Sequence, residues 1–249
     1  MEDELFRRGA DLDRRCEKSA GVTNTGFLTP AQAYELRSWA SRAAVCTVLF
    51  RGGYEGAERK AAFFLPDWMD EESFDEAEYL CAIECTARFG TPGHRDYLGA
   101  VLGLGIAREW LGDILIEGET AWLICMPSVK QHILLNLDKV GRWGVRTREI
   151  PLGDVPRQER KLREIIFSVQ SVRLDAVCAG MFGLSRTAAA EAVAQGQVTL
   201  NYAVCLKTDA AVKDGDVLSL HGKGKGIVLD AGSTNSRRGR LWVKTGIFV

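Results

Sequence analysis

The spacing of apolar residues in the C-terminal third of the chain predicts two short helices followed by short strands. Apolar side chains recur every three or four positions from Leu174 onward, and Ser185 is a good N-cap for a second helix that ends at Gly196. Residues 198–200 and 217–220 alternate between apolar and polar side chains, as half-buried strands do. We therefore expect two helices packed against a small sheet.

The middle of the chain shows a different order of elements: strand, helix, strand, strand, helix, strand. The two central strands are separated by Gly118-Glu119, which suits a two-residue hairpin turn. The order predicts a ferredoxin-like domain, the topology of RNA-recognition (RRM-like) sheets. The aromatic strand signature of those sheets is missing from the sequence, so topology alone assigns no function. The predicted elements span residues 79–87, 94–105, 113–117, 120–126, 127–140 and 143–150.

The N-terminal region predicts a smaller α/β arrangement. Residues 1–20 are charged and carry a thin apolar stripe, which is typical of a surface helix. Thr29-Pro30 marks the start of another helix, because threonine is a good N-cap and proline fits the first helical position. Strands are expected at residues 46–50 and 60–65, joined by a turn rich in glycine and arginine.

Together these elements predict an α+β protein with three folded parts. We expect an N-terminal α/β region at residues 1–78 and a central βαββαβ domain at residues 79–150. A basic linker at residues 151–168 leads to a module of two helices and a sheet, with a basic tail, at residues 169–249. A chain of 249 residues is long enough for two or three domains of this size.

The charge of the chain is unevenly spread, which favours local docking on a polyanion over non-specific coating. The net charge is −1, yet residues 170–249 carry ten Lys and Arg against six Asp and Glu. No stretch is apolar over a membrane-spanning length, and no apolar segment follows the acidic N-terminus, so we expect a soluble, cytoplasmic protein. Seven cysteines without a Cys-x-x-Cys pair, and three histidines, predict neither a metal site nor a cofactor.

The C-terminal module resembles the RNA-binding S-four (S4) domain. The likeness rests on short motifs that follow one another in order between residues 173 and 225. They are Arg173-Leu174-Asp175, Ser185-Arg186 with Ala189, Gly196-x-Val198-x-x-Asn201, Gly215-Asp216 and Gly222-Lys223-Gly224-Lys225. The resemblance implies a module that grips structured RNA by its backbone and shape.

We expect the RNA-binding surface at the start of the second helix of this module. The free N–H groups and the positive dipole end of a helix attract a phosphate, and Arg186 adds a bidentate cation beside them. Basic loop residues and an arginine-rich tail extend this surface. The candidate RNA-binding residues are Arg173, Ser185, Arg186, Thr187, Asn201, Lys207, Lys223, Lys225, Arg237, Arg238 and Arg240.

Upstream motifs extend the resemblance to most of the chain, from about residue 27 to residue 240. These motifs are Gly52-Gly53-Tyr54, Glu58-Arg59, His94-Arg95-Asp96-Tyr97, Gly103-Leu104-Gly105-Ile106 with Arg108, and Leu111-Gly112-Asp113-Ile114. The whole is similar to the YlmH-type family of bacterial proteins, which are often encoded near cell-division genes and have photosystem-named relatives in cyanobacteria and plastids.

This second resemblance implies a non-catalytic protein that binds ribosomal or transfer RNA on a ribosomal subunit, with roles in subunit quality control and a link to cell division. No membrane, metal, cofactor or small-molecule substrate is implied. A candidate second RNA surface consists of Arg51, Arg59, His94, Arg95 and Arg108.

Two other functions stay open on the sequence. Pseudouridine synthases, which modify RNA and often carry an S4 domain, use an Arg-Leu-Asp motif whose aspartate is catalytic, and Asp175 matches it. Here the triplet lies inside the S4-like module with no catalytic-sized domain after it, so we favour local pairing of Asp175 with Arg173 or Arg186. The other alternative is a protein-interaction scaffold that uses the Trp- and Leu-rich middle of the chain.

Overall fold

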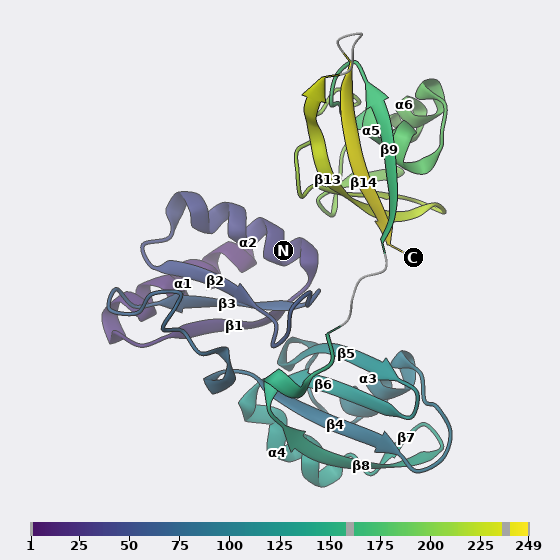
Figure 1. The fold of residues 1–249 in the computed structure, drawn as a ribbon. Helices are drawn as coiled ribbons and strands as arrows, with labels where there is room; N and C mark the ends of the chain where they lie inside the picture. Colours follow the sequence, from purple (N-terminus) through teal and green to yellow (C-terminus); the bar gives the residue numbers. More distant parts are fainter. Residues whose placement is uncertain (1, 158–161, 236–239, 249) are drawn as a thin grey trace. The chain divides into compact units, whose positions relative to one another are not determined.

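In this computed structural model, the N-terminal elements form a three-stranded antiparallel sheet with the strand order β1-β3-β2 and two helices packed on it (Figure 1). The structure describes residues 2–157, 162–235 and 240–248. The elements are α1 (Glu2–Ser19), β1 (Thr23–Leu28), α2 (Pro30–Ala43), β2 (Thr47–Arg51) and β3 (Lys60–Leu65).

The predicted start of α2 is confirmed, because Thr29 is its N-cap and Gln32 completes a capping box. Strand β1 was not predicted from the sequence. Its pairing with β3 shifts register between Asn24 and Phe27, around Gly26 with a φ of 76°, so its apolar residues do not alternate regularly.

The middle of the chain forms a five-stranded sheet with the order β5-β6-β4-β8-β7. The elements follow one another in the order expected from the sequence: β4 (Cys81–Ala87), α3 (His94–Gly103), β5 (Leu111–Glu117), β6 (Thr120–Cys125), α4 (Pro127–Asn136) and β8 (Trp143–Ile150). The helix α4 is shorter than predicted, because the chain leaves the helix at Leu137 and forms the short strand β7 (Lys139–Val140). Single-turn 3₁₀ helices occur at η1 (Glu76–Glu78), η2 (Arg108–Trp110) and η3 (Leu152–Asp154).

The three-stranded and five-stranded sheets share one apolar core. Phe27 and Phe63 from the smaller sheet are buried in the same cluster as Leu115 and Ile124 from the larger one. The chain accordingly divides into two compact units, Met1–Gln158 and Glu159–Val249. The predicted boundary near residue 78 therefore runs through the first unit and does not separate independent cores.

The second unit is a six-stranded sheet with two helices on one face (Figure 1). The strand order is β11-β10-β12-β13-β14-β9. The elements are β9 (Leu162–Val169), α5 (Leu174–Phe182), α6 (Arg186–Ala194), β10 (Val198–Leu200), β11 (Ala203–Val204), β12 (Val217–Leu220), β13 (Gly224–Asn235) and β14 (Leu241–Phe248). The predicted helices and the strands at residues 198–200 and 217–220 are confirmed. Within the described ranges, none of the helices combines the length and apolarity needed to cross a membrane.

Two expectations about this unit need correction. Residues 162–168, assigned to the linker, belong to β9, which pairs with β14 from Leu162 to Val169. The basic stretch near residue 238 is not a terminal tail, because β14 follows it and returns to the sheet. Both strands escaped prediction because their partners are far away in the sequence and they carry charged residues that mask the alternation.

A buried carboxylate attaches α1 to the rest of the first unit. Asp13 is 4% exposed, and it accepts hydrogen bonds from the backbone N–H groups of Val45 and Cys46, both at 2.9 Å. These N–H groups lie between the end of α2 and the start of β2, where neither element supplies an acceptor. Asp13 therefore satisfies two backbone donors that would otherwise be buried without a partner.

We predict that Asp13→Ala lowers the free energy of unfolding of the first unit by about 2–4 kcal/mol, since both N–H groups lose their acceptor. Chemical denaturation of the full chain, followed by circular dichroism, measures this loss. The matched control is Asp11→Ala on the same helix, where the exposed ion pair with Arg14 contributes at most about 1 kcal/mol. Equal losses for the two variants would show that Asp13 does not anchor the helix.

Candidate nucleic-acid interface

The N-terminus of α6 forms as the sequence predicted. Ser185 is the N-cap, and its Oγ accepts the backbone N–H of Ala188 at 3.1 Å. Gly183 ends α5 in the left-handed conformation, with a φ of 64°, and so lets the chain pass from one helix to the next within a short turn. Ser185, Arg186 and Thr187 are all exposed, so the first turn of α6 is open to a ligand.

We expect from the sequence that Arg186 projects freely from this turn, but in the structure it is paired. Its guanidinium donates to both carboxylate oxygens of Asp175 on α5, at 3.1 and 3.2 Å. Arg173 contacts the same carboxylate, with its Nε 3.4 Å from Oδ1. The favoured local pairing of Asp175 with Arg173 and Arg186 is therefore confirmed. We call these three residues the Asp175 triad.

The Asp175 triad is still a cationic surface. The carboxylate side chain is 8% exposed, whereas the side chains of Arg173 and Arg186 are 41% and 51% exposed. Two guanidinium groups share one carboxylate, so an excess positive charge faces the solvent. The triad thus fixes the direction of both arginines and leaves the outer half of each available to an anion.

Asn201, a candidate RNA contact, is buried and hydrogen-bonded within the second unit. It is 8% exposed, its amide donates to Asp216 Oδ1 at 2.8 Å, and its side-chain oxygen accepts the N–H of Val217 at 2.9 Å. With a φ of 50°, it occupies the turn between β10 and β11. By accepting the Asn201 amide, the motif residue Asp216 keeps the turn next to the start of β12. The signal missed in the sequence is that asparagine tolerates a left-handed conformation and so is favoured in tight turns.

The lysine candidates lie in three different places. Lys207 is exposed in the loop after β11, and Lys223 is exposed in the turn between β12 and β13. Lys225 was predicted to lie in a loop, but it lies in strand β13, where it pairs with Ser219. Its ammonium lies 5.0 Å from the ring centroid of Phe248 and 6.0 Å from that of Tyr202.

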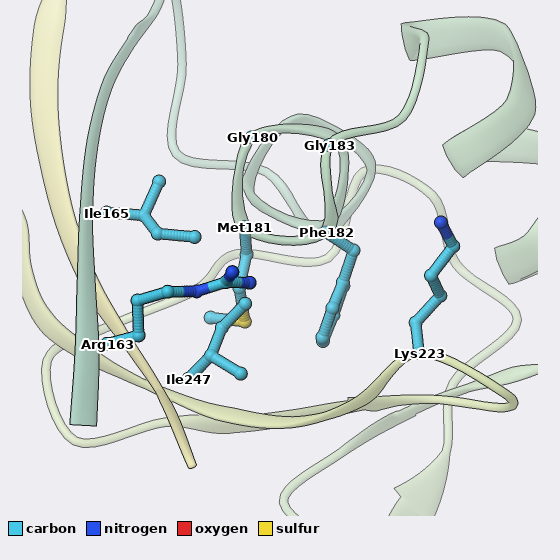
Figure 2. Close-up of a pocket in the computed structure, with 8 residues that line it drawn as sticks. All are labelled: Arg163, Ile165, Gly180, Met181, Phe182, Gly183, Lys223 and Ile247. Carbon is cyan, nitrogen blue, oxygen red and sulfur yellow. The ribbon is translucent and has the colours of Figure 1, made fainter. Parts of the chain in front are cut away.

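Figure 2 shows a cation that the sequence did not suggest, Arg163 at the start of β9. Arg163 and Lys223 lie on opposite sides of a hollow of about 490 Å³ whose floor includes Met181 and Phe182. Within the described residues neither cation forms an ion pair. Arg163 was overlooked because it sits in a basic run that the sequence assigned to a linker.

The arginine-rich segment between β13 and β14 is described only at its end. Arg237 and Arg238 lie outside the described residues. Arg240 is exposed, and its guanidinium donates to the backbone carbonyl of Ser168 on β9.

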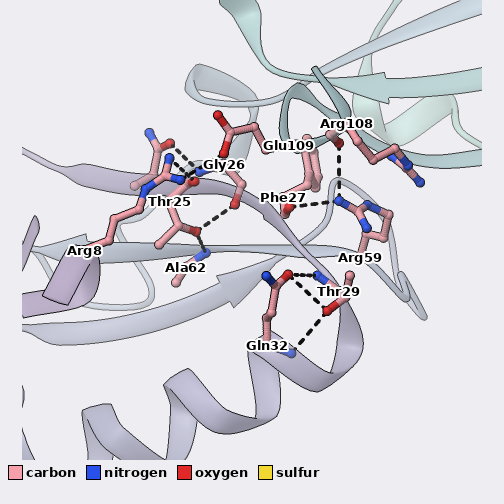
Figure 3. A network of polar contacts seen from close by, with 11 residues as sticks. Arg8, Thr25, Gly26, Phe27, Thr29, Gln32, Arg59, Ala62, Arg108 and Glu109 are labelled. Carbon is pink, nitrogen blue, oxygen red and sulfur yellow. Dashed lines mark hydrogen bonds and ion pairs between the residues drawn. The ribbon is translucent and has the colours of Figure 1, made fainter. Parts of the chain in front are cut away.

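In the first unit, most of the candidate second RNA surface is engaged within the protein, and Figure 3 shows the contacts of Arg59 with Phe27 and Arg108. Arg59 donates to the backbone carbonyl oxygens of Phe27, Arg108 and Leu111, at 2.9 to 3.3 Å. Arg108 donates to the carbonyls of Leu111 and Gly112. Burial lowers the pKa of Arg108 to about 10, with a further contribution from the charge of Arg59. These two arginines join the two sheets.

The glycine-rich turn at residues 51–59 has the same structural role. The hydroxyl of Tyr54 donates to Asp113 on β5 at 2.9 Å, and the backbone N–H of Glu58 donates to the same carboxylate at 2.6 Å. Arg51 forms an ion pair with Glu71 at 2.6 Å. Of the five candidates, His94 and Arg95 remain exposed, in the first turn of α3.

The second unit, with its two helices on one sheet and the exposed start of α6, has the architecture of an RNA-binding S4 domain protein. The family models agree. The S4 domain model matches residues 172–218, and a model described as "Putative RNA-binding domain in YlmH" matches residues 71–154. The chain is 32% identical over 203 residues to the ribosome-associated protein quality control protein P2 of Bacillus subtilis (strain 168). That match covers 81% of this chain and 78% of the relative.

A solved structure supports the fold over part of the chain. The cell division protein ylmH from Streptococcus pneumoniae aligns with a TM-score of 0.53 and 22% identity, over 62% of this chain and 93% of that chain. From these matches the chain belongs to the YlmH family, which confirms the resemblance noted in the sequence.

We predict that Arg186→Ala lowers the free energy of unfolding of the second unit by about 1–3 kcal/mol, because the buried Asp175 carboxylate loses its closest partner. Thermal and chemical denaturation of the full chain measure this effect. Arg186→Ala should lower the free energy of unfolding by less in an Asp175→Asn background, where no buried charge needs compensation. Arg163→Ala is the matched control, an exposed arginine without an ion pair among the described residues, and it should leave stability unchanged. Equal losses in both backgrounds would exclude the pairing as the cause.

Proposed function

We propose that this protein is a non-catalytic, cytoplasmic RNA-binding protein that docks on structured ribosomal RNA or on ribosomal particles. The observation that carries the proposal is the Asp175 triad beside the open N-terminus of α6, where two half-exposed arginines are held in fixed positions. The family membership supports it, since the curated relative is named as ribosome-associated and acting in protein quality control. We extend that role, and the cell-division link in the name of the solved structure, to this chain.

The geometry suits the phosphate backbone of a folded RNA. Backbone N–H groups in the first turn of α6 and the outer edges of the Arg173 and Arg186 guanidinium groups offer donors to phosphate oxygens. The backbone N–H of Asp175 donates to the carbonyl of Thr208 at 3.0 Å, which fixes the loop that carries Lys207 near the start of α5. Recognition of this kind reads shape and backbone, as expected for ribosomal RNA or for transfer RNA on a subunit.

The surroundings of Asp175 favour binding over RNA modification. A catalytic aspartate of the pseudouridine synthase kind has to reach a nucleotide, whereas Asp175 is 6% exposed and lies between two guanidinium groups. Its carboxylate is used to position Arg173 and Arg186. We therefore assign it a structural role in a binding protein.

The first unit contributes a second contact to the particle. We class its central sheet as ferredoxin-like, since the order β5-β6-β4-β8 and the two crossover helices are those of a split βαβ unit. The exposed His94 and Arg95 at the start of α3 are the residues we assign to that contact, in place of the engaged Arg51, Arg59 and Arg108.

We predict that the double change Lys207→Ala and Lys223→Ala weakens binding to an A-form RNA duplex and leaves folding intact. Both side chains are exposed, and each contact with a phosphate releases counterions, so the slope of log affinity against log salt should fall by about 1 per lysine. Binding isotherms at several salt concentrations, with thermal melts alongside, measure this.

The matched control is Arg42→Ala, an exposed cation on α2 in the first unit. It should leave the affinity and the salt slope unchanged. If the lysine variant binds the duplex as tightly as the unaltered chain at every salt concentration, Lys207 and Lys223 do not belong to the RNA-binding surface and the proposed surface is wrong.

A further inference from the structure

We propose that the outer face of the C-terminal sheet, opposite α5 and α6, binds unpaired RNA nucleotides by stacking their bases on Tyr202, Phe248 and Trp242. This inference rests on the proposed RNA-binding function and adds a second type of RNA element to it. The strands β9, β13 and β14 that build most of this face lie outside residues 172–218, which the S4 family model matches.

The alternation of β14 defines the outer face. Val243, Thr245 and Ile247 are buried toward the helices, so Trp242, Lys244 and Phe248 point the other way. Trp242 is 44% exposed, and Ile166 on the neighbouring strand β9 is 63% exposed. A large aromatic side chain thus stands exposed on a sheet face that neither α5 nor α6 packs against.

The turn that carries Tyr202 is an independent sign of function. Leu200 pairs with Ala203 across the two-residue turn Asn201-Tyr202, whose φ angles are 50° and 72°. Such a turn normally has glycine at its second position, because a side chain is disfavoured there. Tyrosine in this conformation is strained, and such strain is typical of functional sites. The strained turn places the Tyr202 ring beside the ammonium of Lys225.

Cations alternate with these aromatic rings, which favours RNA as the occupant. Lys225 lies near both the Tyr202 and Phe248 rings, and Trp242 stands two residues after Arg240, which directly precedes β14, and two residues before Lys244. Rings that stack on bases, with cations between them for the phosphates, are the common design of single-strand RNA sites. The centre of a protein-docking surface is instead depleted of charged residues.

Two carboxylates also belong to this face. Glu164 pairs with Lys244 at 2.8 Å, and Asp230 lies opposite Lys244 in the register of β13 and β14. The ion pair with Glu164 partly neutralises Lys244, whereas the ammonium of Lys225 lies within 6.0 Å of two ring centroids.

The test uses the full chain and a short single-stranded oligoadenylate. Trp242 is the last of six tryptophans in the sequence, and the preceding one is Trp143 in the first unit. The emission lost on titration by the unaltered chain, minus that lost by Trp242→Phe, reports contact at this position. We expect the unaltered chain to be quenched and Trp242→Phe to bind with little quenching.

Affinity changes test the stacking itself. Trp242→Ala should weaken oligoadenylate binding roughly five- to a hundred-fold, as expected for the loss of one base–aromatic stack. It should leave duplex RNA binding unchanged, because that contact uses the helix side of the unit. The matched control is Trp68→Ala, a 68% exposed tryptophan of the first unit, which should affect neither RNA.

The variant Tyr202→Gly distinguishes an RNA-binding role of Tyr202 from a purely structural role. Glycine suits the turn, so this variant should melt at the same temperature as the unaltered chain or higher, yet bind oligoadenylate more weakly. A tyrosine with a purely structural role would give the opposite pattern, with a lower melting temperature and unchanged affinity.

The outcomes distinguish this proposal from the proposed function. If duplex RNA binds and depends on Lys207 and Lys223, but oligoadenylate neither quenches Trp242 nor loses affinity on Trp242→Ala, the outer face is not an RNA site, and a protein becomes its candidate occupant. If oligoadenylate quenches Trp242 while duplex binding ignores the two lysines, the outer-face proposal holds and the helix-side surface fails.

Discussion

The carboxylate of Asp175 is the constraint on which the candidate RNA surface depends. It pairs with Arg173 before α5 and with Arg186 at the start of α6, so one anion sets the direction of two cations. The backbone at the start of α5 is also tied to the loop after Lys207, because the N–H groups of Leu174 and Asp175 donate to the carbonyls of Ala210 and Thr208. Two helix starts and the loop after Lys207 are thereby fixed around a single residue.

The value of this triad lies in orientation and only secondarily in stability. Removing two charges from water costs free energy that their attraction roughly offsets, so a buried ion pair is weak evidence for stability. Arginine side chains that are already fixed, however, lose less conformational entropy when they bind phosphate. The second arginine also ensures that the paired site stays positive overall. A surface of this kind meets RNA without first having to order its side chains.

The sequence was sufficient where structure follows from neighbouring residues. Helix starts at Thr29 and Ser185, the order of elements in the middle of the chain and the S4 motifs all rest on such local signals. It failed where a residue's role depends on distant partners. Arg59 looked like an RNA contact in a glycine-rich turn, yet it binds carbonyls of residues 27, 108 and 111. For the same reason β9 was missed, since among the described strands it pairs with β14 alone.

The outer sheet face departs from the usual pattern of a one-sided sheet in two independent ways. A sheet with one face packed against helices normally presents polar side chains on the other, yet Trp242 and Ile166 are exposed there. Tyr202 adds a strained turn, at a cost of about 1–3 kcal/mol that glycine would avoid. Local rules are broken together most often where a ligand compensates for them. Because the strained ring and the exposed tryptophan share one face with Lys225 and Arg240, a single polyanionic, base-bearing ligand accounts for both departures.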